Sequence, residues 1–254
     1  MIISHDVAGP QDGPAVVLLH SSVCDRRMWD PQWAPLAAAG YRVVRPDLRT
    51  CGDSPAAEAP YSDHGDVLDL LDHLGIRRAV LVGSSSYGGR VALTVAALEP
   101  TRVDALALLC PGRPGHRPSP GLREFGAAED ALLDAGDLAG AAALNARHWL
   151  GPEADEETRA FVRAMQLRNF EGSAADAGSH ELPEPELDLA AVTAPALSAG
   201  GAHDVPDFRL IAAGLPSLVP GATHVELPWA GHLPSLERPR AITELLLEFL
   251  HTIR

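Results

Sequence analysis

The sequence predicts an α/β fold in which a mostly parallel, open sheet carries helices on both faces. Short apolar segments of the β type alternate along the chain with longer segments that have helical spacing. Nearly every position of the short segments is apolar, which is typical of strands buried on both faces. Strands that alternate with helices through right-handed crossovers lie parallel in one sheet. We therefore expect one layered α/β core.

The predicted strands are brief, and glycine or proline bounds most of them. They cover residues 15–20, 41–47, 79–84, 105–111, 194–200 and 224–230. Three predicted helices belong to the same core, at residues 62–75, 87–100 and 238–253. The first of these begins at a Ser/Asp pair, has leucines at helical spacing and ends at a glycine, which are the signals of a capped amphipathic helix.

One region interrupts the alternation of strands and helices. Residues 118–180 contain three helical segments and no strand candidate. A helical insertion between two strands predicts a cap, or lid, over the sheet. We therefore expect residues 118–180 to form the cap, and residues 1–117 and 181–254 to form the core.

The composition limits the class of protein. A chain of 254 residues fits one large domain with a smaller insertion. Its formal net charge of −14 does not suit a nucleic-acid-binding surface. No signal peptide is visible, and the apolar runs are shorter than the ~20 residues that cross a bilayer. Three widely spaced cysteines, Cys24, Cys51 and Cys110, predict free thiols. We expect a cytoplasmic protein that binds neither nucleic acid nor membrane.

The segment AVLVGSSSYGGRVAL, residues 79–93, joins a predicted strand to a predicted helix and contains three serines and three glycines. A phosphate-binding loop needs Lys and then Ser or Thr where this chain has Gly89 and Arg90. A tight turn of small residues without chemistry is one alternative. The other is a nucleophile elbow, a strained turn that holds a serine hydroxyl above the sheet.

Ser86 is the preferred nucleophile of such an elbow. The two arms of the elbow nearly touch, so the residues two before and two after the nucleophile must be small, and Ser84 and Gly88 meet that condition. A nucleophile at Ser85 would place the bulky Tyr87 two residues after it. The helix that starts here adds positive dipole character where an oxyanion would form.

A serine nucleophile needs a base, and the elbow predicts an acid and then a histidine later in the chain. Asp204 and His232 each follow the carboxyl end of a predicted strand. Loops at those ends meet at the edge where open α/β sheets bind ligands. His203 and Glu237 lie close to these two residues, and we expect both to be solvated loop residues without a catalytic role.

The chain resembles the α/β-hydrolase superfamily over essentially its whole length. The segment LLHSSVCDRRMWDPQW (18–33) is similar to the superfamily's His-Gly oxyanion loop, and RPDLRTCGDSP (45–55) is similar to its Asp-x-Arg-Gly turn. PALSAGGAHDVPD and AGHLPSLERP, together with the cap, resemble the enol-lactonase and small-molecule esterase branch. The resemblance implies an oxyanion hole from the backbone N–H groups of Ser22 and Tyr87, and a structural role for His20.

Two serines and one threonine stand where the superfamily usually has glycine: Ser21, Ser84 and Thr50. Ser84 is small enough for the elbow. Ser21 and Thr50 carry a Cβ where a positive φ is expected, which would add strain.

The sequence therefore predicts a serine hydrolase that cleaves a carboxylic ester or lactone of a small, largely apolar molecule. His232 takes the proton of Ser86, Asp204 orients the imidazole, and water releases the acyl-enzyme. Carbon–carbon bond hydrolysis, cofactor-free peroxidation and non-catalytic ligand binding on the same fold are the alternatives. We expect no cofactor, and no metal, because the histidines are scattered without a metal-binding motif.

Large apolar side chains of the first loop and the cap are candidates for the substrate pocket, although such residues more often form the core of a helical layer. The candidates are Met28, Trp29, Trp33, Trp149, Met165 and Phe170. Arg147, His148 and Arg168 are alternatives that would contact an anionic group of the substrate.

Overall fold

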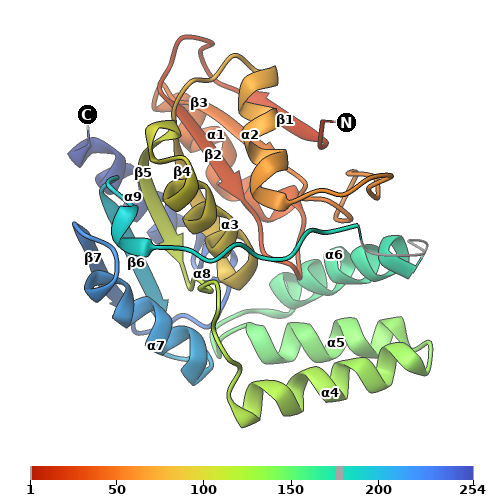
Figure 1. Ribbon diagram of the computed structural model, residues 1–254. Coiled ribbons are helices and arrows are strands. Elements are labelled where there is room, and N and C mark those ends of the chain that lie inside the picture. Colours follow the sequence, from red (N-terminus) through yellow and green to blue (C-terminus); the bar gives the residue numbers. More distant parts are fainter. Residues whose placement is uncertain (1, 175–179, 254) are drawn as a thin grey trace.

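The computed structural model describes residues 2–174 and 180–253 and confirms the predicted fold class. Within these residues a seven-stranded sheet has the order β1-β3-β2-β4-β5-β6-β7, and only the β1–β3 pair is antiparallel. The strands are β1 His5–Ala8, β2 Ala15–Leu19, β3 Arg42–Pro46, β4 Ala79–Ser84, β5 Val103–Leu109, β6 Ala196–Gly201 and β7 Ala222–Leu227. Helices lie on both faces of this sheet (Figure 1).

The central strands are the ones that the apolar runs predict best. Every residue of β2, β4 and β6 is buried. The two edges differ from expectation. The four-residue β1 has too little apolar sequence to be predicted. β7 is exposed or half-buried at all but its last residue, because it has a neighbouring strand on one side only.

Alternate side chains of each strand enter one of two cores, as the two-residue period of a strand requires. Val16, Leu18 and Val82 face the core that contains Leu36 of α1 (Asp30–Ala38) and Leu246 of α9 (Pro239–Thr252). The odd-numbered Val17, Leu19 and Leu81 face the opposite core. Residues of α2 (Asp63–His73) and α3 (Ser85–Leu98) complete that second core.

Three helices follow β5 and form a layer of their own: α4 Pro120–Asp134, α5 Leu138–Trp149 and α6 Glu156–Ala174. Ser119 and Asp137 cap the first two by accepting hydrogen bonds from backbone N–H groups of the first turn. Figure 1 shows these helices stacked beyond the carboxyl ends of the strands. Part of the predicted cap, residues 175–179, lies outside the described residues.

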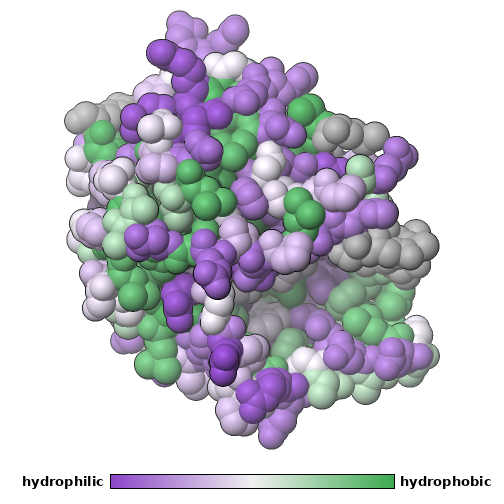
Figure 2. Space-filling model, viewed as in Figure 1, coloured by the Kyte–Doolittle hydropathy of each residue, from purple (hydrophilic) through white to green (hydrophobic). Residues whose placement is uncertain are grey.

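Two more helices follow the last two strands at the same edge: α7 Pro206–Gly214 and α8 Pro234–Glu237. Short 3-10 helices cover Arg26–Trp29, Pro100–Arg102, Leu189–Ala191 and Leu215–Ser217. Among the described residues, no helix combines the length and apolarity needed to cross a membrane. Figure 2 shows hydrophilic and hydrophobic residues mixed over one face, and a recess between the α/β body and the helical layer.

Candidate active site

The carboxyl ends of three strands bring an aspartate and a histidine into direct contact close to the serine loop. Asp204 follows β6, His232 follows β7 and the serine loop follows β4. The Nδ1 of His232 lies 2.7 Å from Oδ2 of Asp204, and both side chains are almost fully buried. The other carboxylate oxygen, Oδ1, accepts a hydrogen bond of 2.7 Å from the amide of Val205. The carboxylate therefore holds the imidazole in one orientation.

The second imidazole nitrogen faces the serine loop. The amide N–H of Ser86 donates to Nε2 of His232 over 3.3 Å. Nε2 is thus the acceptor nitrogen, and the proton of the neutral ring resides on Nδ1, toward Asp204. The contact uses the amide and not the hydroxyl of Ser86. Because that hydroxyl is carried on the same Cα as the amide, rotation about χ1 can bring it toward Nε2.

The serine loop is a strained elbow, but the strain lies one residue earlier than Ser86. Ser85 has a φ of 59°, in the left-handed region that non-glycine residues rarely adopt. A Cβ on Gly83 would lie 2.4 Å from the carbonyl oxygen of Gly88, so the two arms of the turn touch there. The contacting glycines lie symmetrically about the Ser85–Ser86 pair.

The two serines have different surroundings. Ser85 is buried, and its hydroxyl donates a 2.7 Å hydrogen bond to the hydroxyl of Ser21. Ser86 is partly exposed and lines a cavity of about 250 Å³. Ser22 and Tyr87, whose amides are the predicted oxyanion donors, line the same cavity. Ser86 is therefore the serine with access to a ligand.

Aromatic side chains hold the imidazole of His232 between the core and the helical layer. The ring centroid of Phe208 lies 4.4 Å from that of His232, and the centroid of Trp149 lies 4.8 Å from it. The backbone N–H of His232 also donates to the carbonyl of Trp149 over 2.8 Å. Burial, together with the nearby His232, lowers the pKa of His148, which stacks on Phe125 at 3.9 Å. This side of the site is closely packed with aromatic rings.

Glu237 is not the solvated loop residue that the sequence predicts. Its Oε2 accepts a 2.8 Å hydrogen bond from the amide of Gly231, and its Oε1 accepts a 3.2 Å hydrogen bond from the amide of Leu233. Burial raises the pKa of this carboxyl group. Glu237 thus binds the amides on both sides of His232 and fixes the turn that presents the imidazole. His203, in contrast, is exposed, as predicted.

None of the six predicted pocket residues lines the cavity beside Ser86. Met28, Trp29 and Met165 are fully buried in the core, the outcome that helical spacing of large apolar residues most often indicates. Phe170 is half-buried.

The remaining two aromatic candidates and the three basic ones make other contacts. Trp33 lies 4.4 Å from the guanidinium of Arg45, and Trp149 packs against His232 rather than facing the cavity. Arg168 is paired with Asp53. Arg147 and His148, like Arg168, do not line this cavity.

Of the two positions where a non-glycine residue with positive φ is expected, only one has it. Thr50 has a φ of 66°, as predicted, whereas Ser21 is not among the residues with positive φ. The Ser21 hydroxyl instead accepts the hydrogen bond of Ser85. His20 has the expected structural role: Nε2 accepts from the amide of Leu48 over 2.8 Å, and Nδ1 lies 2.8 Å from the carbonyl of Ser21.

Cys110 joins Asp204 and His232 in the one group of potential metal ligands found among the described residues. Their ligand atoms lie within 4.8 Å of one another. The aspartate and histidine are already hydrogen-bonded to each other, and the Cys110 thiol donates to the carbonyl of Gly231. Burial raises the pKa of this thiol well above its usual value, which disfavours the thiolate that binds metals. All three cysteines are free and buried.

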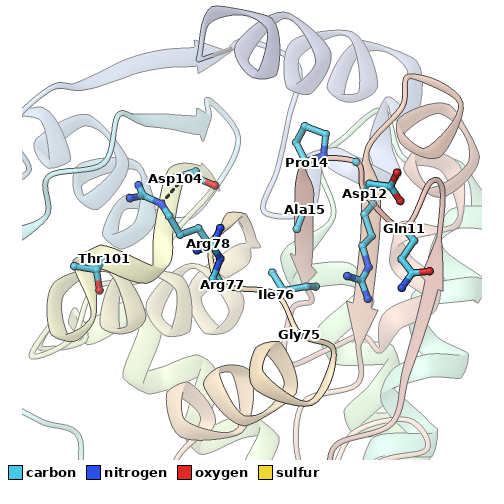
Figure 3. A pocket seen from close by; sticks show the side chains of 12 residues that line it. Gln11, Asp12, Pro14, Ala15, Gly75, Ile76, Arg77, Arg78, Thr101 and Asp104 are labelled. Carbon is cyan, nitrogen blue, oxygen red and sulfur yellow. Dashed lines mark hydrogen bonds and ion pairs between the residues drawn. The ribbon is translucent and has the colours of Figure 1, made fainter.

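A larger, open groove of about 730 Å³ lies at the opposite edge of the sheet (Figure 3). Ala15, Ile76 and Asp104 line it, near the amino ends of β2, β4 and β5. Arg78 in this groove is paired with Asp104 over 2.6 Å. Ligands of open α/β sheets bind at the carboxyl edge, so this groove is separate from the candidate active site.

The fold and the buried Asp–His pair beside a strained serine loop define a hydrolase-type site, and the chain belongs to the alpha/beta hydrolase family. The profile of that family matches residues 16–245. A relative from Variovorax paradoxus named "Putative carbamate hydrolase RutD" is 32% identical, over 98% of this chain and 96% of its own length.

Two solved structures cover nearly the whole chain. An enol-lactonase from Burkholderia xenovorans has a TM-score of 0.78 and 27% identity, with coverage of 98% of this chain and 96% of its own. A thermophilic esterase from Thermogutta terrifontis, solved with malate bound, has a TM-score of 0.82 and 26% identity, with coverage of 99% and 93%. The chain is thus a hydrolase of this family that acts on a small molecule with water.

Proposed function

We propose that the protein hydrolyses a carboxylic ester or lactone of a small molecule through Ser86, His232 and Asp204 and an acyl-enzyme intermediate. The observation that carries this proposal is the buried Asp204–His232 pair, in which Nε2 of His232 accepts a hydrogen bond from the amide of Ser86. An enol-lactonase and an esterase among the similar structures favour acyl transfer as the reaction class.

The chemistry follows from the contacts. After rotation of its side chain, Ser86 gives its proton to Nε2 of His232 as its oxygen attacks the carbonyl carbon. Asp204 stabilises the imidazolium, because its carboxylate already accepts the Nδ1 proton over 2.7 Å. The amides of Ser22 and Tyr87 donate to the oxyanion, and each donor contributes about 3 kcal/mol when it is well aligned. Water then cleaves the acyl-enzyme with the same histidine as base.

The helical insertion, α4 to α6, is proposed to act as the lid over this site. Trp149, the last residue of α5, packs against the ring of His232, and its backbone carbonyl accepts a hydrogen bond from the amide of His232. The lid is therefore in contact with the base itself. The cavity of about 250 Å³ is below the range of pockets for drug-sized ligands, which favours a small substrate.

Fluorophosphonate labelling followed by peptide sequencing tests the proposal and distinguishes the two serines. We expect the wild-type chain and Ser85→Ala to be labelled at Ser86, and Ser86→Ala to resist labelling. Turnover of 4-nitrophenyl acetate should fall by at least about 10³-fold in Ser86→Ala, because members of a catalytic triad act as a unit. His232→Ala should abolish labelling as well.

Two results would contradict this assignment. Labelling of Ser86→Ala combined with loss in Ser85→Ala would identify the strained residue as the nucleophile. An unlabelled wild-type chain that turns over neither 4-nitrophenyl esters nor lactones would exclude a serine hydrolase.

A further inference from the structure

We infer that the substrate carries a carboxylate, and that Arg113 binds it at the cavity beside Ser86. This inference rests on the proposed function and specifies its substrate class. Three features support it: Arg113 lines the cavity, it has no ion-pair partner among the described residues, and the chain as a whole is acidic.

Arg113 is held close to the reacting serine by the backbone. It follows β5 and comes directly after Gly112, where a Cβ would lie 2.9 Å from Cα of Ser86. Arg113 and Ser86 line the same cavity of about 250 Å³. Arg113 therefore belongs to the wall of the cavity onto which Ser86 opens.

Arg113 differs from the other basic residues that line the cavity. Arg90 pairs with Glu184 over 2.7 Å, and His116 pairs with Asp207 over 2.8 Å. Among the described residues, Arg113 has no ion-pair partner. Arg113 is thus the unpaired cation among the described residues that line the cavity.

The chain has a formal net charge of −14. A protein with this charge repels anions in general. The unpaired Arg113 in the wall of this cavity provides a place where binding of a carboxylate is favoured. Arginine also has the planar donors that bind a carboxylate through two hydrogen bonds. The substrate class is therefore a short half-ester of a dicarboxylic acid, or a lactone that bears a carboxylate.

The test uses two esters that differ only in charge: mono-4-nitrophenyl succinate, and its neutral methyl ester. We expect the wild-type chain to have a higher kcat/KM for the anionic ester. Arg113→Gln should reduce the ratio of the two values about tenfold or more, mainly by raising KM for the anionic ester. Arg117→Gln is the matched control, because Arg117 is exposed and does not line the cavity.

Calorimetric titration with succinate, which has a carboxylate but no ester bond to cleave, gives a second readout that needs no catalysis. The wild-type chain and Arg117→Gln should bind it, and Arg113→Gln should bind it at least tenfold more weakly. An unchanged ester ratio and unchanged binding in Arg113→Gln would overturn the inference. If Ser86 is still labelled by the fluorophosphonate, the proposed function is unaffected by that result. Loss of labelling in the wild-type chain would overturn the proposed function instead, and the titration would still decide the role of Arg113.

Discussion

The carboxyl group of Asp63 is buried in the first turn of α2, and burial raises its pKa from 3.8 to about 6. Its Oδ1 has no hydrogen-bond partner among the described residues, and Tyr87 donates a hydrogen bond to the carboxyl group. Because the pKa of Asp63 is higher in the folded chain than in the unfolded chain, its contribution to the free energy of unfolding is fully present below about pH 4, where the carboxyl group is protonated in both states. It is lost as pH rises through about 6.

Replacement of Asp63 by Asn should therefore stabilise the chain at pH 8. A rise in pKa from 3.8 to about 6 corresponds to roughly 3 kcal/mol of unfavourable ionisation in the folded state. The negative charge of Asp63 also interacts favourably with the N-terminus of α2, by about 0.3–1 kcal/mol, and the Asn variant loses this interaction. The net gain in stability is therefore about 2 kcal/mol. For a chain of this size that is a rise in Tm of about 4–8 °C. The asparagine carbonyl can still accept the hydrogen bond of Tyr87.

Thermal unfolding of the wild-type chain and Asp63→Asn at pH 5 and pH 8 measures this effect. We expect the advantage of the variant to be large at pH 8 and to shrink at pH 5, where Asp63 is largely protonated. Asp69→Asn is the matched control, because Asp69 is exposed on the same helix, and its Tm should change by less than about 1 °C. A gain that is equal at both pH values, or absent at pH 8, would refute the reasoning.

Three further substitutions test the turns that build the site. Gly83→Ala should abolish stable folding, measured by soluble yield and circular dichroism, because its Cβ would lie 2.4 Å from a helix carbonyl oxygen. Thr50→Gly should raise Tm by a few degrees, since the φ of 66° strains a β-branched residue, and an unchanged or lower Tm would contradict this. Glu237→Ala leaves the amides beside His232 without their acceptor, so we expect a loss of about 1–3 kcal/mol in urea unfolding and a lower kcat. Glu153→Ala, which removes only an exposed ion pair with Arg238, should change neither.

The sequence by itself determined the central strands and the order of the candidate serine, aspartate and histidine along the chain. β2, β4 and β6 are predicted from their apolar runs because strands buried on both faces need apolar residues at nearly every position. Asp204 and His232 are predicted to meet because each follows the carboxyl end of a parallel strand, and their side chains are in contact. These features follow from short segments that can be interpreted one at a time.

Only the tertiary structure decided which residues surround the serine. The strain at Ser85 rather than Ser86 depends on how closely β4 and α3 approach each other. Glu237 at the end of α8 and Arg113 after β5 lie on segments that follow different strands and converge in space near the serine loop. Glutamate and arginine side chains are ordinarily solvated, and no local sequence pattern marks the few that are not. Contacts between segments that are distant in the sequence determine which of these side chains are buried and shielded from water. The spacing of residues along one sequence does not reveal those contacts.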